Sequence, residues 1–368
     1  MIKNFLQKIY KKISYFFTTK IYGKIEKTIN CHGDKRIEVK TVNMNGGYSY
    51  RIYKISDGRL YTDRVRDTAV ILENKIIEGP SFQLRDNNNA PASNNIVFEK
   101  GTPRRLRNLN GIAASLLTGG GGNNNYWHWI YDVLPRLKLC DQIKKLEQID
   151  FFILPSLKRS FQNETLKELN LGKKKLLSSE VFRHIKAKEL IVTDHPYIVT
   201  NDFHKDSQNI PEWIIKWLRE KFLKDSKRIN KNYPKSIFLH RSDSKPNTPG
   251  YRSLVNEAEI KEFLMKKNFT MIRLNELSFL EQVQYFNNAE CIIGLHGAGF
   301  ANLTFCRHGT KVIEFRTASM GKIIGNLAMK NDLKFDSIVS NPVSTVYGKQ
   351  SGDIKIPLDI LEQKINDI

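Results

Sequence analysis

The stretch 290-ECIIGLHGAGFANL-303 decides the expected fold of this chain. A short apolar run ends at Gly294, and two further glycines flank Ala298 before the sequence becomes compatible with a helix again. A buried strand that enters a helix through a tight glycine turn is typical of α/β domains, whose backbone N–H groups and helix N-termini hold phosphates there. His296 lies within the turn, where an imidazole can hydrogen-bond a diphosphate oxygen. The alternative is a purely structural turn, because tight connections need glycine for steric reasons alone.

Strands and helices alternate on both sides of this turn. The expected strands are 236-SIFLH-240, 270-TMIRL-274 and 310-TKVIEF-315. Helices are expected over 211–224, from Asn256 and from Ser278, where Ser278 and Glu281 form a capping box. A closing helix is expected near 355–368. This alternation predicts a doubly wound nucleotide-binding domain.

Three charged side chains in this half are candidate donor-binding residues. Arg241 follows the expected strand 236–240, and Arg252 comes after a loop with two prolines. Arginines at the carboxyl ends of parallel strands point into the ligand crevice, so Arg241 can neutralise a departing diphosphate. Glu314 ends a strand and can accept both hydroxyls of a ribose. The alternatives are an exposed loop arginine for Arg241 and a surface ion pair for Glu314.

The most unusual passage of the first half is 119-GGGGNNNYWHWIYDVLPRLKL-139. Its glycines and asparagines cannot pack a core, so we expect the loop to be mobile or close to a ligand. His128 and Asp132 are four residues apart at the start of a helix and therefore share one face. Either side chain is well placed to take a proton from an acceptor hydroxyl, although a structural histidine is the alternative. The neighbouring aromatic residues can stack on sugar rings or pack in the core, and for Trp129 we expect the core.

The rest of the first half predicts a second α/β domain. Extended runs are expected at 36–43, 50–56 and 69–79, followed by an exposed loop over 85–95. From about residue 126 an amphipathic run to 139, a strand at 151–154, a helix at 160–170 and a strand at 189–193 indicate a parallel sheet. The expected parts are an N-terminal helix (1–30), a first α/β domain (31–205), a nucleotide-binding domain (206–345) and the closing helix (346–368).

The chain is strongly basic. Its 368 residues include 59 Lys and Arg against 38 Asp and Glu, a formal net charge of +21. Such a charge favours nucleic acid, an anionic membrane or phosphorylated and acidic substrates as partners. The richness in Lys, Asn and Ile is also typical of an AT-rich genome, which would raise the charge without any partner.

The first 30 residues predict a basic amphipathic helix. Seven lysines stand there against the single acid Glu26. Apolar residues recur at three- and four-residue steps on one stripe, namely Ile2, Phe5, Leu6, Ile9, Ile13, Phe16 and Phe17. Such a helix can lie in the headgroup layer of an anionic bilayer, each lysine adding about 1 kcal/mol near the surface. Packing of the stripe on its own domain is the alternative.

The sequence favours a cytoplasmic protein. Cys31, Cys140, Cys291 and Cys306 form no CxxC pair, a pattern that fits free thiols in a reducing compartment. No run of about 18 apolar residues predicts a transmembrane helix, and we find no signal-peptide pattern. The N-terminal helix would allow peripheral attachment to the inner face of the membrane.

Taken together, these motifs resemble glycosyltransferase family 61, whose bacterial members look like transferases of capsule and other surface polysaccharides. The resemblance spans roughly residues 110–320. The matching residues are Asn125, Tyr126, Trp127, His128, Trp129, Asp132 to Arg136, Arg241, Arg252, Asn256, Glu257, Leu277, Ser278, Glu281, Gln282, Gly294, His296, Gly297, Ala298, Gly299, Asn302 and Gly309 to Glu314. The chain departs from the family pattern at Trp127, Leu295 and the pair Arg307-His308, where the family often has Tyr, Pro and Pro-Pro or similar.

The resemblance implies a two-domain GT-B fold, in which two Rossmann-like domains face a central cleft, and an inverting, metal-independent transfer. The implied donor is a nucleotide sugar such as a UDP-sugar, no cofactor is needed, and the acceptor is a glycan or lipid-linked glycan of a capsule, a lipopolysaccharide or similar. His128 or Asp132 would be the base. Arg241, His296 and the backbone of 297–299 would stabilise the leaving diphosphate, with Arg252, Gly294, Asn302 and Glu314 on the donor side and Asn125, Tyr126 and Trp127 on the acceptor side. The sequence agrees on the metal, because no Asp-x-Asp triplet follows a strand.

Two other classes of function remain open on the sequence. The charge suits a nucleic-acid binder, but we find no RNP-type, helix-turn-helix or zinc-finger pattern and expect no nucleic-acid partner. A glycan-binding protein without catalysis, with a decayed transferase fold, is the other alternative. The retention of every candidate polar group argues against decay.

Overall fold

The computed structural model divides the chain into two compact units, Met1–Ser207 and Gln208–Ile368. The structure describes residues 2–62, 68–81, 91–117, 125–199, 203–226, 231–241, 252–343 and 352–367. Each unit combines helices with a sheet that contains parallel strands, so the fold is α/β.

The first unit is built on one mixed sheet. Its strands are β1 (Lys27–Ile29), β2 (Ile37–Met44), β3 (Tyr48–Ser56), β4 (Arg59–Thr62), β5 (Thr68–Leu72), β6 (Lys75–Ile77), β7 (Arg107–Ser115), β8 (Phe151–Leu154), β9 (Lys175–Ser178) and β10 (His184–Thr193). Its helices are α1 (Ile2–Tyr22), α2 (Val97–Lys100), α3 (Tyr126–His128), the π-helix η2 (Trp129–Val133), α4 (Pro135–Cys140), α5 (Ser160–Glu168) and α6 (Phe203–Asp206), with short 3₁₀ turns η1 (Ala92–Asn94) and η3 (Leu146–Gln148).

Strand β10 lies at the centre of this sheet. The order is β1-β6-β5-β4-β10-β7-β8-β9, and β3 also pairs with β10 and carries β2 on its other side. β10, β7, β8 and β9 are joined in parallel, which confirms the parallel sheet expected for the strands at 151–154 and 189–193. Strands β7 and β9 were not predicted. β3 and β4 run antiparallel to β10. From the sequence we expect a doubly wound sheet in this unit. That expectation is wrong for β3, β4 and β5, which pair antiparallel with their neighbours.

Short turns explain the antiparallel part, because only antiparallel neighbours can be joined by a tight hairpin. Gly46 and Gly47 between β2 and β3 have φ values of 86° and 76°. The run 69–79 folds as the hairpin of β5 and β6, because Glu73 adopts a left-handed φ of 53° and reverses the chain. β10 and its neighbours bury one core, with Tyr53, Ile55, Leu60, Val70, Ala113, Ile153, Ile185 and Leu190 among its members.

The second unit contains a wholly parallel sheet. Its strands are β11 (Ser236–Leu239), β13 (Thr270–Ile272), β14 (Cys291–Leu295), β15 (Lys311–Arg316) and β16 (Lys334–Val339), while β12 (Arg252–Leu254) and β17 (Gly352–Ile354) pair separately. Its helices are α7 (Glu212–Ser226), α8 (Glu257–Lys266), η4 (Leu274–Glu276), α9 (Phe279–Asn288), η5 (Ala298–Phe305), α10 (Ile323–Lys330) and α11 (Leu358–Asn366). The order β13-β11-β14-β15-β16 is 2-1-3-4-5 in chain order, a doubly wound arrangement.

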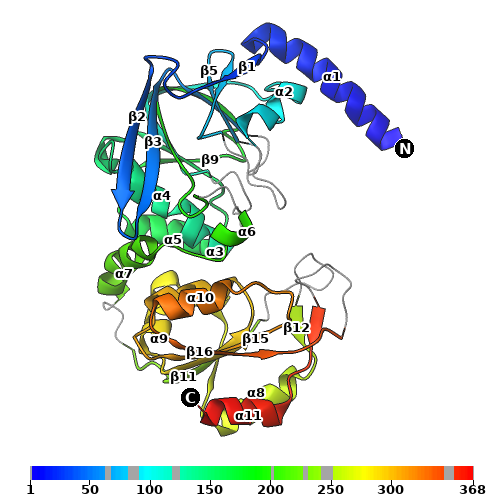
Figure 1. The fold of residues 1–368 in the computed structure, drawn as a ribbon, viewed down its shortest axis with the longest axis vertical. Helices are drawn as coiled ribbons and strands as arrows, with labels where there is room; N and C mark the ends of the chain where they lie inside the picture. Colours follow the sequence, from blue (N-terminus) through cyan, green and yellow to red (C-terminus); the bar gives the residue numbers. More distant parts are fainter. Residues whose placement is uncertain are drawn as a thin grey trace. The chain divides into compact units, whose positions relative to one another are not determined.

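Helices cover both faces of this sheet. Figure 1 shows α9 and α10 on one side and α8 and α11 on the other. Ile260 and Leu264 of α8 and Leu361 of α11 pack with Phe238 and Ile293 of the sheet. The predicted capping box at the start of α9 is confirmed, since Ser278 N donates to Glu281 Oε2 at 3.1 Å and Ser278 Oγ accepts from Glu281 N.

Helix α1 exposes its apolar stripe. Leu6, Ile13, Phe16 and Phe17 are between 52% and 58% exposed, so these four residues do not pack on their own domain, against that alternative. Figure 1 shows α1 extending away from the sheet of the first unit. None of the helices in the described part of the chain is long and apolar enough to cross a membrane.

Candidate active site

The strand order of the second unit defines a ligand position between β11 and β14. In a 2-1-3-4-5 sheet the connections leave the first and third strands in opposite directions, and ligands bind outside the carboxyl ends of these strands. Arg241 follows β11, and His296 follows β14. Arg241 Nη1 donates to the backbone oxygen of His296 at 3.1 Å. Two of the sequence-predicted donor residues therefore meet at the switch point.

The glycines of the turn after β14 allow neighbouring groups to come very close. A Cβ atom on Gly294 would lie 2.9 Å from Leu239 Cβ of the adjacent strand. A Cβ atom on Gly297 would lie 3.1 Å from Arg241 Nη1. Gly297 has an extended φ of 174°, so close approach rather than backbone strain explains this glycine. The chain then continues from Ala298 as the 3₁₀-helix η5.

His296 and Glu314 form a buried pair behind the turn. His296 Nδ1 is hydrogen-bonded to Glu314 Oε1, and Glu314 is 0% exposed. Burial lowers the pKa of His296, and the Glu314 carboxylate offsets part of this effect. The other carboxylate oxygen, Oε2, is buried and has no hydrogen-bond partner among the described residues. The surface ion pair considered for Glu314 is excluded by this burial.

Arg252 joins the same group from β12. Its Nη1 donates to the backbone oxygen of His296 at 2.8 Å, so Arg252 and Arg241 converge on one carbonyl. Burial and the adjacent Arg241 lower the pKa of Arg252 to about 10, against the opposing effect of Glu314. Two guanidinium groups brought this close together create a positive site that an anionic ligand would stabilise.

The other predicted donor-side residues serve the packing of η5. Asn302 is fully buried, and its Nδ2 donates to Gln282 Oε1 of α9 at 3.1 Å. A Cβ atom on Gly299 would lie 2.6 Å from Leu274 Cδ1. These contacts fix the direction in which η5 leaves the turn.

In the first unit a π-helix places His128 and Asp132. The expected helix from Tyr126 is divided into α3, η2 and α4, and Leu134 N donates to Trp129 O, a contact five residues apart. π-helical turns inside helices occur frequently at functional sites. His128 Nδ1 is hydrogen-bonded to Asp132 Oδ2 at 2.9 Å, as the four-residue spacing predicts.

Asp132 is the centre of a buried polar cluster. It is 0% exposed, and the backbone oxygen of the same residue accepts from Arg136 Nε at 3.1 Å. Burial alone would raise the pKa of Asp132, but His128 and His195 lower it overall through charge and hydrogen bonding. The carboxylate therefore stays ionised. The His128 side chain is 29% exposed, so its ring links this buried charge to the surface.

His195 is a member of this cluster that the sequence reasoning missed. Its Nδ1 accepts from the backbone N–H groups of Tyr197 (3.3 Å) and Ile198 (3.1 Å), so the neutral ring carries its proton on Nε2. That nitrogen lies 3.7 Å from Asp132 Oδ2. Burial lowers the pKa of His195, which favours the neutral form. A cue was present, because His195 closely follows an expected strand, where functional residues of α/β sheets gather.

The predicted acceptor-side residues are mainly packed within the unit. Asn125 caps α3 by accepting from Trp127 N at 2.9 Å. Tyr126 lies edge-on to Phe161 with ring centroids 5.1 Å apart, and Trp127 is 8% exposed. Trp129 is fully buried, which confirms the expected core position.

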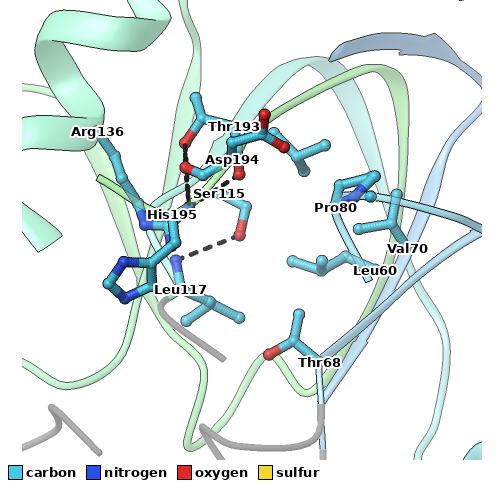
Figure 2. Close-up of a pocket in the computed structure, with 12 residues that line it drawn as sticks. Leu60, Thr68, Val70, Pro80, Ser115, Leu117, Arg136, Thr193, Asp194 and His195 are labelled. Carbon is cyan, nitrogen blue, oxygen red and sulfur yellow. Dashed lines mark hydrogen bonds between the residues drawn. The ribbon is translucent and has the colours of Figure 1, made fainter. Parts of the chain in front are cut away.

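Cavities open at the carboxyl end of β10. One of about 470 Å³, in the size range of small-molecule sites, is lined by Ser49, Arg51, Glu78, Gly79, Pro91, Ala92, Ser93, Asp194, His195, Ile198 and Val199. Figure 2 shows the smaller pocket beside it, where Arg136 Nη1 donates to the backbone oxygens of Thr193 (3.0 Å) and Asp194 (3.3 Å). His195 lines both cavities, and its Nε2 lies 3.7 Å from Asp132 Oδ2. The His195 ring therefore lies between the cavities and the buried carboxylate.

Comparison with known proteins identifies the family. Curated proteins give no significant match. The family described as Glycosyltransferase 61 matches residues 126–313, just over half of the chain, and this range contains the His128–Asp132 pair together with Arg241 and His296. The resemblance found in the sequence is thereby confirmed. The chain belongs to glycosyltransferase family 61 and is a glycosyltransferase.

Proposed function

We propose that this glycosyltransferase inverts the anomeric carbon of a nucleotide sugar, for which we favour a UDP-sugar, without a bound metal. The observation that carries the proposal is the His128–Asp132 pair, in which a fully buried carboxylate holds one ring nitrogen of a partly exposed histidine. In the proposal, the other ring nitrogen, Nε2, takes the proton of a substrate hydroxyl. Such a pair is the usual construction of a general base.

His128 rather than Asp132 is the base in this proposal. Asp132 is 0% exposed and already bonded to the ring, so it cannot reach an acceptor. The acceptor O–H gives its proton to His128 Nε2 while the oxygen attacks the anomeric carbon. The bond from that carbon to the diphosphate breaks on the opposite face, and its electron pair stays with the diphosphate. Asp132 stabilises the imidazolium that forms.

The leaving diphosphate is received by the second unit. Arg241 and Arg252 converge beside the 297–299 turn, at the position where doubly wound sheets bind nucleotides. Their fixed positive charges stabilise the negative charge that develops on the diphosphate, the role that a divalent cation has in other transferases. Because these two proposed sites lie in different units, the proposal includes the GT-B fold that the family resemblance implies.

The acceptor is proposed to be a surface glycan such as that of a capsule or a lipopolysaccharide. The cavity of about 470 Å³ beside His195, with charged Arg51 and Asp194 in its lining, offers hydrogen-bonding groups of the kind that sugar hydroxyls use. A lipid-linked acceptor, on a cytoplasmic enzyme bound to the inner membrane face, agrees with the exposed apolar stripe of α1 and with the basic residues 1–30.

The test is turnover of His128→Ala against a panel of nucleotide sugars. We expect a loss of roughly 10²-fold or more in kcat for the true donor, with the donor KM little changed. Full activity of the unaltered enzyme in excess EDTA and an inverted anomeric configuration by NMR complete the expected result.

Near-normal turnover of His128→Ala would remove the proposed base. Activity that disappears in EDTA and returns with a divalent cation would remove the metal-independent mechanism. A product that retains the donor configuration would remove the single displacement.

A further inference from the structure

A second positive site lies in the first unit, away from the transfer machinery. Four arginines line a cavity of about 230 Å³ together with Glu180 and Val181, namely Arg104, Arg105, Arg107 and Arg183. Arg104, Arg105 and Arg107 are exposed at the surface. Four guanidinium groups against one carboxylate give this cavity a positive potential, and guanidinium forks match phosphate oxygens.

The arginines of this cavity are supported by the fold. Arg107, the first residue of β7, places its guanidinium over the Phe182 ring at 4.7 Å from the centroid. Arg183 Nε donates to the backbone oxygen of Glu180 at 3.2 Å. Stacking and hydrogen bonding reduce the freedom of these long side chains, so binding a ligand costs less ordering entropy than on an unsupported surface.

The cavity lies next to the C-terminal end of α1. Leu106, which lies between the arginines, donates its backbone N–H to Tyr22 Oη at the end of α1 (3.1 Å). His184 Nδ1 hydrogen-bonds the backbone oxygen of Arg104 at 2.8 Å, and the His184 ring lies edge-on to Tyr22 with centroids 5.0 Å apart. Arg104 and the C-terminal end of α1 therefore both contact His184, the first residue of β10.

The side of α1 that contacts the unit is not the apolar side. Tyr15 and Thr18 lie next to Gly101, where a Cβ atom would be 3.2 Å from each. Phe16 and Phe17, on the other side, are 54% and 58% exposed, and Lys20 Nζ lies over the Phe16 ring. An exposed apolar stripe interleaved with lysines is characteristic of helices that lie in the headgroup layer.

We infer that the arginine cavity binds the phosphate of an anionic membrane lipid while the apolar stripe of α1 enters the same leaflet. This inference rests on the membrane contact proposed above and adds a specific headgroup site to it. Charge complementarity favours a lipid over a second copy of this chain, because a second copy would bring another net charge of +21 to the same surface. Nucleic acid would leave the apolar stripe in water.

The experiment measures sedimentation of the full-length protein with vesicles of phosphatidylcholine alone and of phosphatidylcholine with phosphatidylglycerol. We compare Arg105→Gln/Arg107→Gln with Lys167→Gln/Lys173→Gln, which removes two exposed charges elsewhere in the first unit. The wild type should bind the anionic vesicles at least tenfold more tightly than the neutral ones. The cavity variant should lose roughly tenfold of this binding, and the lysine variant less than threefold.

Two controls separate this site from catalysis and folding. Donor hydrolysis in solution should be unchanged in the cavity variant. A failure of the proposed transfer mechanism would therefore be detected independently of lipid binding. If Arg107→Gln lowers the unfolding temperature, Arg104→Gln/Arg105→Gln leaves the Phe182 contact intact and should give the same loss of binding.

Equal losses in the cavity and lysine variants would overturn the headgroup site, as would equal binding of the wild type to both vesicles. Self-association of the wild type without vesicle binding would identify a second copy as the occupant. Thermal stabilisation by 10 mM inorganic phosphate, lost in the cavity variant and unaccompanied by vesicle binding, would identify a free anion instead.

Discussion

At the scale of single residues, Asp132 is the residue that would support the proposed base, His128. It accepts from His128 at 2.9 Å and is fully buried, so it would act on a substrate through the His128 ring and not by direct contact. Asp132→Asn removes the charge that stabilises the imidazolium, and kcat should fall by roughly 10² to 10⁴-fold with the donor KM nearly unchanged. Steady-state kinetics checks this, with Asp141→Asn, a carboxylate at the end of α4, as the control. Unaltered kcat would show that the His128–Asp132 hydrogen bond has no part in turnover.

The buried histidine His184 predicts a pH dependence of stability. Burial and the adjacent Arg59 lower the pKa of His184 from 6.5 to about 4. The folded state then binds fewer protons than the unfolded state, so stability is lost as pH falls from about 6.5 to 4. The loss from this group is about 2 to 3 kcal/mol at pH 4.5. His184→Gln retains a donor and an acceptor but does not titrate.

Urea unfolding at pH 7.5 and 4.5 measures this effect. The decrease in unfolding free energy between the two pH values should be smaller in His184→Gln by about 2 kcal/mol. The other buried histidines remain in both proteins, so their contribution cancels in the comparison. Equal decreases would mean that His184 takes up its proton without unfolding.

Residue identity was the part of the site most accessible from the sequence. The spacing of His128 and Asp132 predicted that they share one helix face, and they are in contact. Arg241 and His296 were predicted separately as residues that follow strands, and the contact between them was not predicted. His195 was missed because it lies 63 positions after Asp132 in the sequence. Helical spacing predicts contacts only between residues three or four positions apart.

At the scale of elements, the turn after β14 positions Arg241. A Cβ atom on Gly297 would lie 3.1 Å from Arg241 Nη1, so Gly297→Ala should displace the guanidinium rather than unfold the sheet. We expect the donor KM to rise by roughly tenfold, corresponding to one charge-assisted hydrogen bond of about 1.4 kcal/mol. Gly172→Ala is the matched control, since its Cβ atom would have no neighbour closer than 3.8 Å. An unchanged KM with a lowered unfolding temperature would contradict this role.

Elements with clear periodicity and caps were predictable, and those set by tertiary contacts were not. The four strands β11, β13, β14 and β15 and the Ser278 capping box follow from local sequence. Strands β12, β16 and β17 were not predicted, and β17 lies in the range 346–368 that was assigned to a closing helix. The π-helix at Trp129–Val133 does not, because its extra residue per turn is stabilised by burial of Trp129 and Tyr131. The antiparallel strands on β10 depend on pairings between distant segments, which alternation of strand and helix cannot reveal.

At the scale of the whole molecule, the proposal requires one chain to supply both halves of one catalytic centre. The proposed base, His128, lies in Met1–Ser207, and the proposed diphosphate site lies in Gln208–Ile368. His128→Ala and Arg241→Gln should therefore each reduce kcat by roughly 10²-fold or more, although they alter different units.

Mixing the two inactive variants tests this requirement directly. If both sites act within one chain, an equimolar mixture of His128→Ala and Arg241→Gln should have no more activity than the mean of the two proteins measured separately. Exchange of units between copies would instead rebuild a complete centre and restore up to about a quarter of wild-type activity in a randomly assembled dimer. Full turnover in Arg241→Gln would show that the diphosphate binds elsewhere. His128 would remain a candidate base, but the donor site proposed for the second unit would be wrong.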